Sequence, residues 1–96
     1  MVRYLSLISF TDKGIRDLSK SLQRAGDFRS AVESKGGRVL SQYWALGNVD
    51  GCVVFESPDD QTAAALLLKL GQEDNVRTNT MRVFDVQEFT AIADDA

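Results

Sequence analysis

The order of elements along the sequence predicts an α+β domain of the ferredoxin-like class, βαββαβ, in which an antiparallel four-stranded sheet carries two helices on one face. Three observations support this prediction. Residues that favour β-structure gather in four segments, at about 2–9, 38–46, 52–56 and 78–86. Two segments with apolar residues at steps of three and four, after Thr11 and after Ser57, predict the helices. The turn residues at 47–51 predict a hairpin between the two middle strands.

The first helix is expected to begin at Thr11 or Asp12, both of which are good N-cap residues. Its apolar stripe includes Phe28 and predicts one buried face. Gly26 and the serines before it are poor helix formers, so we expect a kink near 19–26. The pair Gly36-Gly37 predicts a left-handed C-terminal cap.

The second helix is expected to start with Ser57 as its N-cap and Pro58 in its first turn, and to stop at Gly71. Its expected buried residues are Ala63, Ala64, Leu67 and Leu70. After the fourth strand, residues of about 87–96 form an acidic tail whose end we expect to fray. Residues 1–96 contain no linker or repeat, which predicts a single domain.

All four predicted strands have apolar residues on both faces, whereas helices can cover only one face of the sheet. The other face would then be an exposed apolar patch of the kind that marks an interface. The sequence therefore predicts a homo-oligomer, a dimer or higher, that assembles through the sheet.

Composition excludes several classes of function. The net charge of −3 and the dispersed basic residues argue against binding to nucleic acid. The longest apolar run, 63–68, is too short to span a membrane, and the N-terminal residues do not resemble a signal peptide, so we expect a cytoplasmic protein. The absence of histidine argues against haem, zinc and Ser-His-Asp chemistry. We expect no metal and no cofactor, and we expect Cys52 to be a buried, inert thiol.

The predicted topology places the end of the first strand, the hairpin and the start of the fourth strand at one edge of the sheet. Three loops there would bring acids, amides and a guanidinium beside two aromatic rings, which suits a small-ligand site. Asp50 and Arg77 are expected within reach of one another, and Arg77 makes an anion a candidate ligand. The candidate ligand-binding residues are Thr11, Tyr43, Trp44, Asn48, Asp50, Arg77 and Thr78. For Thr11 and Asp50 taken singly, capping of the local backbone is the stronger interpretation.

The same residues resemble the GYD-domain family. The matching segments are YLSLISFTDKGIRDL at 4–18, Arg24 and Phe28, GGRVLSQYWALG at 36–47, DGCVVFESPDD at 50–60 and NVRTNTMRVF at 75–84. The family takes its name from a Gly-x-Tyr-Asp turn, in which Gly47 and Asp50 match but Val49 replaces the tyrosine. The resemblance implies a ferredoxin-like domain related to the dimeric α/β-barrel superfamily, whose members pair their sheets and enclose cavities. It implies architecture and no particular chemistry.

Three hypotheses about function follow from these expectations. The first is a small oligomeric domain that binds a small ligand in a cavity between the sheet and the helices. The second is a cofactor-free enzyme of the dimeric-barrel type, an isomerase or an oxygenase, which a strongly raised carboxyl pKa in the cavity would favour. The third is a structural or regulatory oligomer without a ligand.

Overall fold

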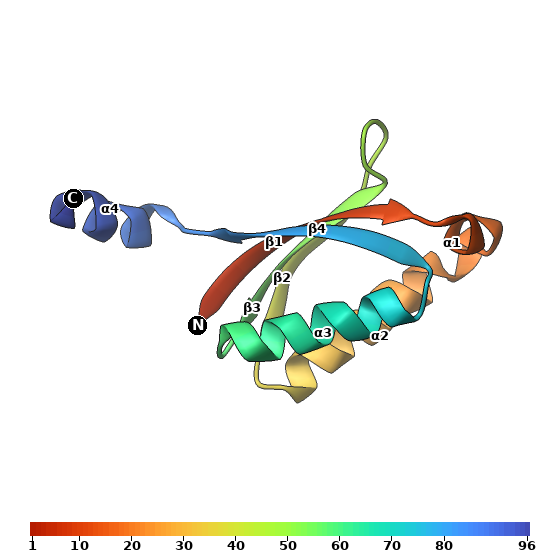
Figure 1. The fold of residues 1–96 in the computed structure, drawn as a ribbon, viewed down its shortest axis with the longest axis horizontal. Coiled ribbons are helices and arrows are strands. Elements are labelled where there is room, and N and C mark those ends of the chain that lie inside the picture. Colours follow the sequence, from red (N-terminus) through yellow and green to blue (C-terminus); the bar gives the residue numbers. More distant parts are fainter.

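The structure is a computed structural model that describes residues 1–96, and it confirms the ferredoxin-like order of elements (Figure 1). The four strands form one antiparallel sheet in the order β2-β3-β1-β4, and α2 and α3 lie together against one of its faces. The elements are β1 (Val2–Phe10), α1 (Asp12–Arg16), the 3₁₀ helix η1 (Leu18–Lys20), α2 (Ser21–Ser34), β2 (Arg38–Trp44), β3 (Gly51–Ser57), α3 (Asp60–Gln72), β4 (Val76–Val83) and α4 (Val86–Asp95). None of these helices is both long and apolar enough to cross a bilayer.

The core lies between the sheet and the helices α2 and α3. Phe55 at its centre is fully buried, stacks against Tyr4 of β1 with 5.3 Å between ring centroids, and meets the edge of Phe28 of α2 at 5.4 Å. Such aromatic pairs add to the hydrophobic gain from burial. The other buried apolar residues of the core are Val32, Val39, Val53, Ala63 and Leu66.

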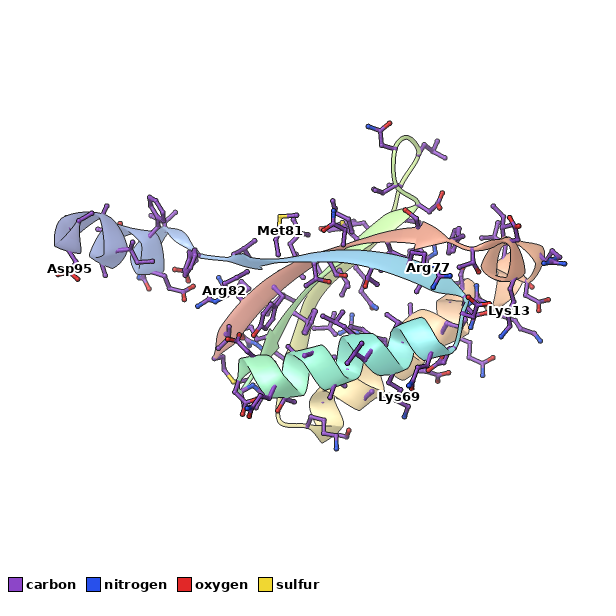
Figure 2. All side chains as sticks on the ribbon, viewed as in Figure 1. Lys13, Lys69, Arg77, Met81, Arg82 and Asp95 are labelled. Atoms are coloured by element: carbon purple, nitrogen blue, oxygen red, sulfur yellow. The ribbon has the colours of Figure 1, made fainter.

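The register of the strands divides their side chains between two faces. Tyr4 pairs with Phe55, and both side chains point toward the helices; residues one step along each strand therefore point the other way. We call that second side of the sheet the open face, and Figure 2 shows Met81 on it, away from α3. Its apolar residues include Leu5, Leu7, Tyr43, Cys52, Val54, Met81 and Val83. Cys52 is half-buried there, so the expectation of a buried thiol was wrong.

The first helical segment is interrupted, as expected, but the interruption begins earlier than the predicted 19–26. α1 ends at Arg16, and the 3₁₀ turn at Leu18–Lys20 separates it from α2. The predicted C-terminal cap of α2 is confirmed, because Gly36 has a φ of 85°. The N–H of Gly37 donates to Val32 O at 3.0 Å and that of Gly36 to Glu33 O at 3.0 Å, which is the hydrogen-bond pattern of a Schellman motif.

The second helix begins and ends later than the sequence predicted. Ser57 is still paired with Val2 in the sheet, so the helix can begin only after Pro58. Asp59 is the N-cap, and its carboxylate accepts from Thr62 N at 2.8 Å. At the other end the left-handed residue is Asp74, with a φ of 63°, rather than Gly71. Of the residues expected to be buried on this helix, Ala63 is buried, Leu67 and Leu70 are half-buried and Ala64 is exposed.

The last residues form a helix, α4, which the sequence analysis did not predict. A capping box starts α4: Asp85 accepts from Glu88 N at 2.8 Å, and Glu88 accepts from Asp85 N at 3.1 Å. β4 also ends at Val83, three residues earlier than predicted, because Val83 pairs with Arg3 close to the start of β1. Figure 1 shows α4 beyond the end of β4, away from α2 and α3.

Candidate functional site

Three segments that are far apart in the sequence meet at one end of the sheet, as the topology predicted. Asp50 N donates to Ile8 O at 2.8 Å, which fastens the β2–β3 loop to β1. Thr11 N donates to Asn75 O at 3.1 Å, which fastens the end of β1 to the start of β4. The loop itself runs from Ala45 to Asp50, longer than the predicted turn, and Gly47 in it has a φ of 135°.

A cavity of about 70 Å³ lies at this end, between the helix-covered face of the sheet and the first turns of α2. Its surface is almost entirely apolar. The apolar side chains come from β1, α2, α3 and the start of β4, and include Ile8, Phe10, Ala25, Phe28, Leu70 and Val76. A cavity needs about 10–15 Å³ to hold one water molecule, so this one has room for a compact group of several heavy atoms.

One face of α2 forms the helical wall of the cavity. Arg24 and Ala25 each lie three or four residues from both Ser21 and Phe28, so the four residues share a side of the helix. Ala25 leaves space where a larger residue would fill the cavity. Trp44 of β2 reaches across to the start of this helix, where its Nε1 donates to Ser21 Oγ at 3.2 Å.

Several polar side chains around the cavity are hydrogen-bonded to the protein itself. The Asp50 carboxylate accepts from Phe10 N at 2.8 Å. The Arg24 guanidinium donates to Gly14 O at 3.2 Å and to Asp17 O at 3.3 Å. Gln42 donates to Ala25 O at 3.1 Å and accepts from Arg29 at 3.1 Å. These bonds leave mostly carbon atoms facing the cavity.

The cavity gathers three of the seven candidate residues, namely Tyr43, Trp44 and Asp50. The alternation of β2 points the Trp44 side chain toward α2, whereas Tyr43 pairs with Cys52 and points to the open face. Tyr43 therefore contributes mainly its backbone to the wall of the cavity.

The other four candidates lie outside the cavity lining. Thr11 caps α1, accepting from Gly14 N at 3.0 Å, and Asn48 is exposed in the loop. Thr78 pairs with Ile8 in the sheet. Arg77 pairs with Ser9 on the open face, and its ion pair is with Asp74 at 3.6 Å. The expected pairing of Arg77 with Asp50 was therefore wrong, because the alternation of β4 points Arg77 away from the cavity.

Sequence reasoning missed the residues that the helices bring to the cavity. Arg24 and Phe28 were noted only for their place in the helix and in the family pattern. A signal was present, because Ser21, Arg24, Ala25 and Phe28 mix polar and small residues into an otherwise large apolar stripe. Such a change along a buried stripe marks a place where the packing is incomplete.

The groups with shifted pKa values lie elsewhere. Glu56 lies on the open face, at the end of the sheet opposite to the cavity. Its carboxylate accepts from Arg3 at 2.9 Å and from Arg38 at 3.0 Å. Burial raises the pKa of Glu56, but the hydrogen bonds from the two arginines outweigh burial and leave this pKa below its usual value. Hydrogen bonds from the backbone N–H groups of Thr62 and Glu88 lower the pKa of Asp59 and of Asp85 respectively.

Tyr4 has the largest shift. Burial of its phenol, together with the hydrogen bond that the hydroxyl donates to Asp60, raises its pKa to about 12. This hydrogen bond joins β1 to the first turn of α3 on the core side of the sheet. Tyr4 lies among core residues and does not line the cavity.

Comparison with known proteins supports this fold and identifies the family. The crystal structure of FFRP-DM1 is similar, with a TM-score of 0.59 and 17% identity over 88% of this chain and 100% of that chain. The Mycobacterium tuberculosis leucine response regulatory protein LrpA matches with a TM-score of 0.57 and 16% identity, over 88% of this chain and 51% of its own. No curated protein matches the sequence. The family model of the GYD domain matches residues 4–93, nearly the whole chain, and the protein therefore belongs to the GYD domain family.

Proposed function

We propose that the protein is a small-molecule-binding module that assembles with copies of itself through the open face of its sheet. The observation that carries the proposal is the apolar cavity at the end of the sheet, bounded by Phe10, Phe28 and Trp44. Ligand sites in proteins are concave, mostly apolar and lined by a few placed polar groups, and this cavity has those properties.

The geometry favours binding over catalysis. A catalytic carboxyl group in a cavity is expected to have a raised pKa. The carboxyl groups whose pKa values are clearly shifted are those of Glu56, Asp59 and Asp85; all three are lowered, and none lines the cavity. The enzyme hypothesis therefore gains no support from the arrangement of the side chains.

Assembly through the open face is supported by the apolar residues that the helices leave uncovered. Leu5, Leu7 and Val54 form a half-buried centre, with Tyr43 64% and Met81 42% exposed beside them. A stable interface buries about 800 Å² on each partner, which is the scale of one face of a small sheet. Two copies that pack these faces together would cover the apolar centre and leave both cavities on the outer, helical sides.

The ligand-binding proposal is tested by NMR with a mixture of neutral and charged small molecules. We expect amide shifts to gather at the cavity, in Ala25, Phe28 and Val53, while residues at the far end of α3 stay unchanged. Absence of a shift from every probe, or shifts confined to the open face, would overturn the proposal.

The assembly proposal is tested by light scattering on a matched pair of variants. Leu5→Lys places a charge at the centre of the open face, whereas Leu68→Lys makes the same change on the solvent side of α3, where Leu68 is 69% exposed. We expect the unchanged protein and Leu68→Lys to be at least dimeric at micromolar concentration, and Leu5→Lys to dissociate. A monomeric unchanged protein would contradict this part of the proposal.

A further inference from the structure

The lining and the volume of the cavity also indicate the chemical class of its ligand. We infer that it selects a compact, uncharged molecule with an apolar body, and that it rejects anions of the same size. The inference rests on the proposed function, because it specifies the class of molecule that the cavity binds. It replaces the anion that Arg77 suggested from the sequence, since Arg77 points to the open face.

The lining of the cavity carries one cationic and one anionic side chain. Arg24 is the cation of the lining, and its guanidinium donates to the backbone carbonyls of Gly14 and Asp17. The Asp50 carboxylate lines the same cavity and repels a second anion. Two of the five N–H groups of Arg24 are taken by backbone carbonyls, and the lining holds no other cationic side chain. An anion that enters the apolar part of the cavity would lose its hydration there, which is costly.

Two neutral polar side chains of the lining, Gln42 and Trp44, are already hydrogen-bonded within the protein. The side-chain amide of Gln42 donates to one residue of α2, Ala25, and accepts from another, Arg29. The indole N–H of Trp44 donates to Ser21. A ligand that depends on many hydrogen bonds would have to break these contacts. An apolar body breaks none of them and fills space beside Ile8, Phe28 and Leu70.

The volume of the cavity limits the size of its ligand. With about 70 Å³ of space, the cavity holds a group of four or five carbon atoms. One end of it lies near the half-exposed Trp44, so a single polar group on the ligand can remain in water there. The ligand class is therefore a short aliphatic or small cyclic molecule with at most one uncharged polar group.

A series of straight-chain alcohols tests this class on the unchanged protein. Each added methylene group should tighten binding about fourfold, since its burial is worth about 0.8 kcal/mol. From ethanol to n-butanol the dissociation constant should therefore fall about sixteenfold, to the millimolar range, as measured by the amide shifts of Ala25 and Phe28. Butyrate, which has the same chain length and a carboxylate, should bind at least about tenfold more weakly than n-butanol.

A matched pair of variants localises the effect. Ala25→Leu fills the cavity from α2, and Ala64→Leu makes the same change at an exposed position of α3. We expect the shifts caused by n-butanol to disappear in Ala25→Leu and to persist in Ala64→Leu. The chain-length series needs no variant, so it decides the question even where Ala25→Leu does not fold.

The possible outcomes separate this inference from the proposed function. Tighter binding of butyrate or inorganic phosphate than of n-butanol at the cavity would overturn the ligand class and leave a binding cavity. Equal binding of ethanol and n-butanol would also overturn the class. If no probe shifts the cavity residues, both the inference and the proposed function fail.

Discussion

The carboxylate of Asp50 accepts a hydrogen bond from the backbone N–H of Phe10 at 2.8 Å. The backbone of the same residue donates to Ile8 O and accepts from Ala45 N, each at 2.8 Å. One residue therefore fastens the β2–β3 loop to the last residues of β1 and closes the loop on itself. Because Phe10 and Asp50 both line the cavity, this fastening also fixes part of its wall.

Asp50→Ala should destabilise the fold, because it leaves the N–H of Phe10 without a partner in a partly buried position. The expected loss is about 1–3 kcal/mol of unfolding free energy. Asp50→Asn keeps an oxygen that can accept this bond and should cost less than about 1 kcal/mol. Urea unfolding measures both, with Asn48→Ala at an exposed position of the same loop as the control. Equal losses for Asp50→Ala and Asn48→Ala would contradict this account.

Glu56→Gln should destabilise the protein at neutral pH, because the buried carboxylate binds both Arg3 and Arg38. The pKa of Glu56 is lowered in the folded state, so the ionised group contributes stability above its ordinary value of 4.5. That contribution is lost as the pH falls through the lowered pKa, and the difference between the two proteins should shrink in acid. Urea unfolding across this range provides the measurement.

A matched change at an exposed ion pair is the control for Glu56. Asp74 pairs with Arg77 at 3.6 Å, and both side chains are more than half exposed. Asparagine also tolerates the left-handed backbone of position 74. Asp74→Asn should therefore change the unfolding free energy by less than about 1 kcal/mol. Burial predicts that Glu56→Gln costs more unfolding free energy than Asp74→Asn. A larger loss for Asp74→Asn would contradict this prediction.

Gly26 and Gly37 should respond in opposite directions to alanine. A Cβ at Gly37 would clash with the backbone oxygen of Glu56, so Gly37→Ala must push the connection between α2 and β2 away from β3 and destabilise the fold. A Cβ at Gly26 meets nothing within 4 Å inside a regular helix, and Gly26→Ala should stabilise by up to about 1 kcal/mol. Thermal unfolding of the two variants decides the signs.

The sequence predicted the order of elements because the periodicities and turn residues are local signals. Gly36-Gly37 predicted the end of α2 correctly for this reason. The capping pattern of Asp85 and Glu88 is also a local signal, and it favours the start of a helix in the acidic tail. The start of α3 was missed because it depends on pairing of Ser57 with β1, which is a long-range contact.

The topology predicted the end of the sheet at which the cavity lies, and three of the seven candidate residues line that cavity. Topology brings Asp50 and the start of β4 together, but the parity of each strand decides which face a side chain takes. Arg77 pairs with Ser9 and therefore faces away from the helices. The cavity depends on Phe28 and Ala25 of α2 packing against β1, and no sequence pattern fixes such a gap between elements.

The phenol of Tyr4 should ionise at a higher pH than an ordinary tyrosine, and the free energy of unfolding should therefore depend on pH in the alkaline range. Burial and the hydrogen bond to Asp60 raise its pKa to about 12 from 10.0. A pKa raised by folding means that the stabilising contribution is complete below pH 10.0 and is lost as the pH rises toward about 12. Absorbance of the tyrosinate should show one phenol ionising late and together with unfolding. In Tyr4→Phe that late step should be absent and unfolding above pH 10.0 should depend less on pH, whereas a late step that persists in Tyr4→Phe would assign it to Tyr43 instead.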